Sequence, residues 1–596
     1  MAALLAWLGR RPEVRLGEGR FAAALARLAE HGPAGCSRVS LPGFELALLK
    51  AGTPSEALAG PPRVQGAAPA LAGALIGWLW ETEATVRTLG LPSPPTDQTE
   101  LLLAAVARRA QAGLLALEGA FAALVYDPRA HEVLLRTDLA GQRALYLCAV
   151  EEGCWISSDE AALVAQPGLA SVEPLHVARL LCALAPPADA GWFRGVKQVG
   201  AGQLWRVDGQ GAHCLLQSGL PERAVPRQRA AVVEAFRALQ AQAVRRCCAG
   251  IPAGTLGLSM SGGLDSLGVA AHVRAQSMPL MGLSWTLQQT PDSDESAAIA
   301  TAAQALKLPL QAFAADALTP LGGAPRRVAR GELLSNLYRE IKQRLYGEAR
   351  SHGIRVLLNG AGGDQLYGTA RGWLTETLAR GHLGAALAEL GWRMAHGTMP
   401  WRDPAVRQVG RVLLGRPPPD PGLLAGLHPA WQQAVRAAGL PPPTRRILLN
   451  GPYAARAAAA EHAHAEVLGL ELRSPWRDPD LMAFALSLSP HLLARRGQRK
   501  WLGRAALAGC LPEPQRLAAK RGDLSFFLRE ALAGPVRARW QTLLTSAHAA
   551  WPDYVQPAAI HAALAHPALC SEAALLGLWL CVALEHWREA CQRRSA

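Results

Sequence analysis

The chain has few lysines and no long apolar run, and each shortage excludes a class of protein. Its apolar stretches stay well short of the roughly 18 consecutive residues that a membrane-spanning helix needs, so we expect no membrane contact. Its basic residues stand singly or in pairs, without the dense tracts and interleaved aromatic residues of a nucleic-acid surface. The net charge of +14 therefore does not predict a nucleic-acid partner.

In so arginine-rich a chain, a lysine indicates a place that needs a compact ammonium. The lysines are Lys50, Lys197, Lys307, Lys342, Lys500 and Lys520.

The cysteines and the N-terminus both favour a reducing compartment. The eleven cysteines lack metal-binding spacings, and their odd number favours free thiols over a disulfide framework. Arg10 and Arg11 follow the first apolar run, whereas the basic residues of a secretory signal precede it. We therefore expect a cytoplasmic protein. Its 596 residues, half of them apolar, predict a folded chain of two or more domains.

Residues 256–270, LGLSMSGGLDSLGVA, have the pattern of a phosphate-binding turn. A short apolar strand leads into two adjacent glycines and then into a helix. Such glycines let consecutive N–H groups face one side, and the helix N-terminus adds a positive dipole end. Asp265 is placed to bind a Mg²⁺ ion that rides on the phosphate oxygens. A bare Gly-Gly pair would more often be an ordinary turn. The whole string after a strand, however, resembles the pyrophosphate loop of ATP pyrophosphatases.

That resemblance implies ATP and Mg²⁺ as cofactors, with cleavage of ATP between its α and β phosphates. Strands alternate with helices in this half of the chain, which predicts a doubly wound parallel sheet with the nucleotide beyond the carboxyl ends of its strands. The residues expected to contact the nucleotide are Leu258, Ser259, Ser261, Gly262, Gly263, Asp265, Ser266, Ser284 and Gly360.

A second apolar strand also ends in glycines and an aspartate, in residues 356–367, VLLNGAGGDQLY. Alone, this loop would be as consistent with a structural turn as with a site. In a parallel sheet it can lie beside the first loop, so we expect Asp265 and Asp364 to share one or two Mg²⁺ ions that bridge the triphosphate.

Three strings near the C-terminus extend the resemblance. LRSPWRDPD at 472–480, RKWLGRAAL at 499–507 and AKRG at 519–522 resemble the corresponding strings of asparagine synthetases and β-lactam synthetases, in the same order. In those relatives the lysine that matches Lys520 points at the phosphates and the reacting carbonyl. The resemblance therefore implies Lys520 as a catalytic residue beside Asp265 and Asp364. For Lys500 a structural role and a functional one both stay open.

A polar cluster precedes the first of these strings. Its charged and titratable residues offer either a base for catalysis or a cap for a helix, and the cap is the favoured interpretation. They are Glu461, His462, His464 and Glu466.

Residues 1 to about 215 read as strand-rich, with antiparallel sheet as the local prediction. Roughly residues 70–165 resemble the glutaminase-type domain of asparagine synthetases. The resemblance implies an α/β protein with two parts: an Ntn-hydrolase-like β-sandwich at residues 1–217, and an ATP-pyrophosphatase domain with many helices at 227–596. Thr137 and Ala144 stand where the family has arginine and proline. The matching residues are Thr99, Glu100, Gly119, Phe121, Asp138, Gly141, Leu145, Tyr146, Ser158 and Glu160.

The residue between Gly360 and Gly362 discriminates among amine acceptors. Asparagine synthetases have glutamate there and β-lactam synthetases a tyrosine, whereas this chain has Ala361. The chain also has Ala2 where working glutaminases of the family have a nucleophilic cysteine. These two features together make the chain similar to lasso peptide cyclases. Those enzymes adenylate an Asp or Glu side chain of a precursor core peptide and join it to that peptide's N-terminal amine.

The lasso resemblance implies a core peptide as substrate, with a leader peptidase and a leader-binding protein as further partners. Three alternatives stay open: a small-molecule amide or β-lactam synthetase, an ammonia-dependent asparagine synthetase, and an enzyme of the same loop type that modifies tRNA.

We predict that the protein does not release ammonia from glutamine. Working glutaminases of this type have a cysteine after the initiator methionine, whose thiolate attacks glutamine, and this chain has Ala2. Incubation of the pure protein with glutamine should yield no glutamate above the buffer control. Glutamate formation that a thiol-blocking reagent abolishes would contradict the prediction.

Overall fold

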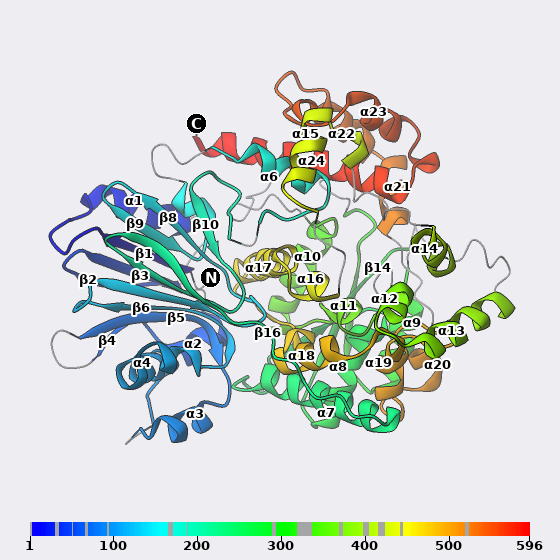
Figure 1. The fold of residues 1–596 in the computed structure, drawn as a ribbon, viewed down its shortest axis with the longest axis horizontal. Coiled ribbons are helices and arrows are strands. Elements are labelled where there is room, and N and C mark those ends of the chain that lie inside the picture. The colour runs from blue at the N-terminus through cyan, green and yellow to red at the C-terminus, as the bar shows by residue number, and fades with distance from the viewer. Residues whose placement is uncertain are drawn as a thin grey trace.

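The computed structural model describes the chain except for residues 1–2, 30–34, 51, 66–69, 92–93, 165–170, 188, 289–293, 319–335, 369–372, 397–403, 415–423, 441–444, 519–523 and 596. Two antiparallel sheets form the N-terminal part, shown from blue to cyan in Figure 1. The first has the strand order β10 (Val196–Val199), β8 (Leu145–Val150), β9 (Gly153–Ser157), β1 (Ala3–Gly9), β3 (Phe44–Lys50), β2 (Gly35–Leu41). The second has the order β12 (Gly211–Gln217), β11 (Gln203–Asp208), β7 (Glu132–Thr137), β6 (Gly119–Asp127), β5 (Leu71–Leu79), β4 (Arg63–Gln65).

The two sheets pack face to face because alternate residues of each strand point to opposite sides. Leu4, Ala6 and Leu8 of β1 lie in the same buried cluster as Ala72 and Ala74 of β5. The other faces are covered by helices, namely α1 (Glu18–Ala29) on the first sheet, and α2 (Pro54–Ala59), α3 (Thr82–Leu89) and α4 (Gln98–Leu115) on the side of the second. Strands β6 and β7 pair as an antiparallel hairpin.

A five-stranded parallel sheet forms the centre of the second part. Its order is β15 (Leu310–Ala314), β14 (Met281–Thr286), β13 (Leu256–Ser259), β16 (Val356–Leu358), β17 (Glu471–Arg473). Leu358 packs in one buried cluster with α7 (Arg229–Cys248) and α8 (Leu264–Ala275), while Leu357 packs in another with α10 (Arg339–Ser351). Helices therefore cover both faces of the sheet, as the sequence predicts.

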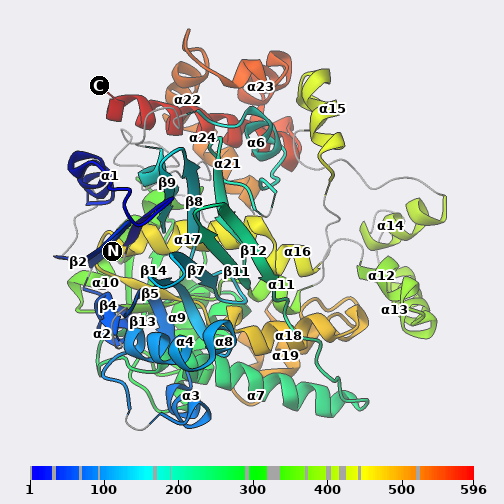
Figure 2. The ribbon, with the colours of Figure 1, turned by 60° about the vertical axis from the view of Figure 1, so that its left-hand side comes forward.

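The C-terminal helices form a layer that also packs on the N-terminal part. Figures 1 and 2 place α24 (Glu572–Ser595) beside α6 (Pro174–Leu181), with α15 (Pro429–Ala437) on the same side. Arg179 of α6 donates a hydrogen bond to the carbonyl oxygen of Gly439 (3.0 Å). Further helices are α5 (Glu160–Leu163), α9 (Ser296–Ala305), α11 (Gly363–Tyr367), α12 (Trp373–Ala379), α13 (Leu383–His396), α14 (Pro404–Leu413), α16 (Arg445–Asn450), α17 (Pro452–Glu466), α18 (Pro479–Ser487), α19 (Trp501–Ala506), α20 (Glu513–Leu517), α21 (Leu524–Ala533), α22 (Val536–Leu544) and α23 (Pro557–Ala565).

None of the helices in the described ranges has both the length and the apolar character needed to cross a bilayer. The cysteines whose side chains are described carry free thiols, as the sequence predicts.

The favoured interpretation of the polar cluster at residues 461–466 as a helix cap is wrong. The cluster lies inside α17 and fixes this helix to its neighbours. Glu461 accepts hydrogen bonds from Tyr346 and from Lys342 (2.9 Å), both on α10, and Glu466 forms an ion pair with Arg143 of the N-terminal part. The sequence gives no sign of these partners, because they are distant along the chain.

Buried ion pairs hold the N-terminal part against α17. Arg143 and Glu466 are both more than nine-tenths buried, and so are Arg456 and Glu160, whose charged atoms lie 3.5 Å apart. Glu160, one of the residues that match glutaminase domains, also accepts the N–H of Trp192. These matching residues thus have structural partners in this chain.

We predict that Glu466→Ala destabilises the protein. Removing one partner of a buried ion pair leaves the Arg143 charge uncompensated, at a cost of about 3–5 kcal/mol. The midpoint of thermal unfolding should fall by several degrees. Glu83→Ala, which removes half of an exposed pair with Arg87, should shift the midpoint little. The double variant Arg143→Met/Glu466→Leu should recover part of the loss; a double variant less stable than Glu466→Ala would contradict the charge argument.

Candidate active site

The two predicted carboxylate loops meet at one edge of the parallel sheet. Strands β13 and β16 are direct neighbours, and Leu258 pairs with Leu358. Both strands therefore end at the same edge, and a helix follows each of them. Asp265 lies in the first turn of α8 and Asp364 in the first turn of α11.

Two glycines of the second loop let it touch the first. A Cβ atom added to Gly360 would lie 2.8 Å from the backbone of Asp265 and Ser266, and one added to Gly363 would lie 2.6 Å from Cγ of Asp265. Atoms do not approach so closely without moving backbone or carboxylate. The glycines of the Gly-Ala-Gly-Gly-Asp string are thus required by the close approach of the loops.

Lys500 joins the two carboxylates. Its Nζ lies 2.7 and 2.8 Å from the two carboxylate oxygens of Asp265 and 2.7 Å from Oδ1 of Asp364. The Lys500 side chain is 14% exposed, that of Asp265 19% and that of Asp364 49%. Solvent therefore reaches the Lys500 ammonium from the side of Asp364. Both aspartates thus face one cationic position.

The Asp265 carboxylate is further fixed by two aromatic residues. Tyr367 donates its hydroxyl to Oδ1 (2.7 Å), and the indole N–H of Trp476 donates to the Asp265 carbonyl oxygen (2.9 Å). Burial raises the pKa of Asp265, and Asp364 adds to this, whereas Lys500 and Tyr367 lower the pKa. Losing the Lys500 charge would therefore favour the protonated carboxyl, which does not bind a metal.

The turn at residues 260–266 presents a backbone donor to an anion. The N–H of Gly262 donates to a carboxylate oxygen of Glu295, 3.0 Å away. Ser266 holds the turn closed, because its Oγ accepts from the Ser261 N–H and lies 2.9 Å from the Ser261 Oγ. The sequence predicts that Gly262 contacts the nucleotide, and its N–H already donates to an anionic oxygen, that of Glu295.

These residues fit the cofactors that the sequence implies. The Lys500 ammonium lies between the two aspartates and marks a position where a cation neutralises both of them. The Glu295 carboxylate accepts from the N–H of Gly262 and marks a position where a phosphate oxygen would accept from the same N–H. Asp265 and Asp364 would hold the Mg²⁺ ion, which supplies charge neutralisation on the phosphates when it is bound.

The remaining predicted residues lie around this edge or outside the described ranges. Leu258 and Ser259 end β13, and Ser284 is buried in β14, one position beyond the pairing of Ser259 with Leu283. Gly263 directly precedes α8. Lys520 lies in the undescribed range 519–523, so its predicted role stays a prediction.

Sequence reasoning did not single out three residues of this site. The sequence leaves the role of Lys500 open, although the rarity of lysine is the signal that marks it. Tyr367 follows Asp364 by one helical turn, a spacing that carries no specific signal. The contact of Glu295 with Gly262 depends on how the loop of Glu295 folds back, which the sequence does not show.

Sequence comparisons agree with this geometry. The asparagine synthase family matches residues 235–589, more than half of the chain, and the glutamine amidotransferase domain matches residues 85–216. The protein is an ATP-dependent carbon–nitrogen ligase with an N-terminal domain of the amidotransferase type. It belongs to the asparagine synthase family.

No curated protein matches the chain. Among solved structures, it is similar to glutamine phosphoribosylpyrophosphate amidotransferase from B. subtilis complexed with ADP and GMP, at 12% identity over 61% of this chain and 91% of that chain, with a TM-score of 0.28. It is also similar to an allosteric regulatory enzyme of purine biosynthesis, at 12% identity over 60% and 89% of the two chains, with a TM-score of 0.28. Likenesses this distant support no conclusion about the site.

We predict that Asp265 and Asp364 bind the same metal ion. Asp265→Asn and Asp364→Asn should each weaken Mn²⁺ binding in the presence of α,β-methylene-ATP by about tenfold or more, because each removes one charged ligand. Titration followed by electron paramagnetic resonance measures this. The double variant should bind Mn²⁺ more weakly than either single variant, because the shared ion then loses both charged ligands. Asp208→Asn, at the end of β11, is the control. Wild-type Mn²⁺ affinity in either single variant would contradict the assignment.

Proposed function

We propose that the protein closes a macrolactam ring in a peptide, as lasso peptide cyclases do. The substrate is a precursor core peptide with an Asp or Glu side chain and a free N-terminal amine. A leader peptidase, which frees that amine, and a leader-binding protein are the proposed partners. Membership of the asparagine synthase family supports the first half of the reaction, ATP-dependent activation for amide formation.

The reaction has two balanced steps. A carboxylate oxygen of the peptide attacks the α-phosphorus of ATP, and the bond to the β-phosphate oxygen breaks to release pyrophosphate. The N-terminal amine then attacks the acyl carbon and loses a proton, and AMP leaves with the electrons of the acyl C–O bond. The product carries one amide bond in place of one carboxylate and one amine.

Different residues of the site would perform different parts of this reaction. The amides of the turn at 260–263 would bind the phosphates, and Asp265 and Asp364 would hold Mg²⁺. Lys500 faces both carboxylates, and its charge lowers the pKa of Asp265 against the effect of burial. Lys520 is proposed to stabilise the charge that develops on the acyl carbon's oxygen and on the leaving AMP, because a compact cation favours that charge.

The observation that carries the choice of amine is Ala361. This residue is exposed between Gly360 and Gly362, and its N–H donates to the Asn359 side chain (3.0 Å). Its methyl group neither binds ammonium nor removes a proton from a nucleophile. An N-terminal amine has a pKa of about 7.7–8.0 and is partly unprotonated at neutral pH, so it needs no such help.

We predict ring closure in synthetic peptides with a free N-terminus and one Asp at successive positions. With ATP and Mg²⁺, mass spectrometry should detect a product that lacks one water for at least one ring size. The N-acetylated peptide should still release pyrophosphate but form no ring. Lys520→Ala should lower product formation by orders of magnitude while sparing ATP binding.

The outcomes separate the alternatives. Asparagine formed from aspartate and ammonium, or a lactam formed from a β-amino acid, without ring closure in the peptide panel, would replace the proposal with a small-molecule synthetase. Adenylation of a tRNA base would replace it with a tRNA-modifying activity, whose RNA binding would weaken steeply with salt.

A further inference from the structure

A second cavity lies between the N-terminal sandwich and α7. Its volume is about 460 Å³, within the range of sites that bind small molecules. Residues 242–250, at the end of α7, form one wall and lead into the start of β13. The candidate active site follows the other end of the same strand. The cavity therefore belongs to the amino-end side of the parallel sheet and is distinct from the nucleotide site.

The opposite wall is aromatic. Trp78 and Trp80, at the end of β5, are 1% and 7% exposed, and Leu58 adds an apolar contact surface. The indole N–H groups of both tryptophans are buried and have no hydrogen-bond partner among the described residues. The wall thus presents a mainly apolar surface to the cavity.

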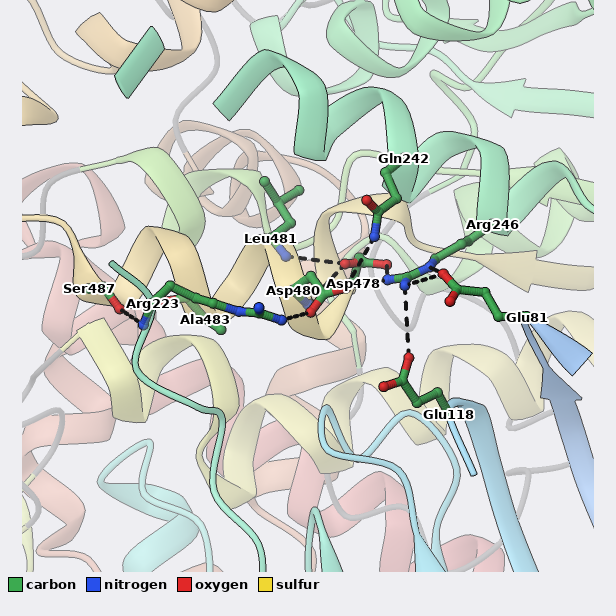
Figure 3. Close-up of polar contacts among 10 residues, drawn as sticks. All are labelled: Glu81, Glu118, Arg223, Gln242, Arg246, Asp478, Asp480, Leu481, Ala483 and Ser487. Carbon is green, nitrogen blue, oxygen red and sulfur yellow. Dashed lines mark hydrogen bonds and ion pairs between the residues drawn. The ribbon is translucent and has the colours of Figure 1, made fainter. Parts of the chain in front are cut away.

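Arg246 also lines the cavity, and nearby carboxylates already neutralise its charge. In Figure 3 its guanidinium lies between Glu81 on one side and Asp478 and Asp480 on the other. Its Nη1 is 2.9 Å from Asp478 and 2.8 Å from Asp480, and its Nη2 is 2.6 Å from Glu81. Its guanidinium also lies over the Trp80 ring, 5.1 Å from the centroid. Arg246 therefore holds the two domains together and is not the group that a ligand would neutralise.

Two other charged groups at the cavity are available, and they have opposite signs. Arg245 is exposed and has no ion pair with any described residue. Glu81 is 52% exposed, and both bonds from Arg246 go to its Oε1, which leaves Oε2 without a partner among the described residues. Glu81 also has a φ of 54°, a left-handed conformation that is unusual for a residue other than glycine.

We propose that this cavity binds a free α-amino acid with an apolar side chain. The ammonium group pairs with Glu81, the carboxylate pairs with Arg245, and the side chain lies against Leu58 and the indole rings. A residue within a peptide lacks both charges and a terminal residue lacks one, so the pair of charges favours the free amino acid.

The test measures calorimetric binding of L-phenylalanine and of two analogues that each lack one charge, phenethylamine and 3-phenylpropionate. Each analogue should bind about tenfold more weakly than phenylalanine, because a charged hydrogen bond is lost. Arg245→Gln should weaken phenylalanine and phenylpropionate but leave phenethylamine unchanged. Glu81→Gln should weaken phenylalanine and phenethylamine but leave phenylpropionate unchanged.

Arg129→Ala, on the turn between β6 and β7, is the matched control and should bind all three compounds like the unaltered protein. Absence of saturable binding of phenylalanine at millimolar concentration would overturn the proposal. Equal effects of the two variants on both analogues would overturn it as well. The titrations contain neither ATP nor peptide, so their outcome is independent of the proposed cyclase activity.

Discussion

Two like charges meet at one position at the edge of the parallel sheet, and the surrounding structure keeps them there. The carboxylates of Asp265 and Asp364 would repel each other and take up protons if they were left alone at a partly buried edge. Lys500 supplies the opposite charge within 2.8 Å of both. Neighbouring parallel strands bring the loops to the same edge, and Gly360 and Gly363 remove the side chains that would keep the loops apart.

A short segment connects this position to the N-terminal domain. Trp476 holds the backbone of Asp265, Arg477 donates to the carbonyl oxygen of Ala140 (2.7 Å), and Asp478 pairs with Arg246. Three consecutive residues therefore contact the loop of Asp265, the amidotransferase-type domain and α7. The amidotransferase-type domain thus has a structural function, because it helps to support the segment that fixes Asp265.

The parts predicted correctly from sequence are those that depend on local order. A strand, a glycine turn and an aspartate repeat twice, and parallel topology then places both aspartates at one edge. The roles of Lys500 and Glu466 were not predictable in the same way, because each depends on a partner hundreds of residues away. For Glu466 the local pattern even favoured a cap, since sequence spacing does not show which face of α17 meets another domain.

The distribution of lysine and arginine follows from the geometry of their charges. A buried guanidinium can satisfy several acceptors at once, and Arg473 shows this by donating to Glu471 and to the carbonyl oxygens of Cys247 and Ala249 while it lies 4.3 Å from the centroid of the Trp78 ring. Arginine is therefore suited to the polar contacts that join the two domains. An ammonium is a compact point charge, and it fits between two carboxylates that approach from different loops. Lys500 is such a case, because its single nitrogen lies within 2.8 Å of carboxylate oxygens from both Asp265 and Asp364.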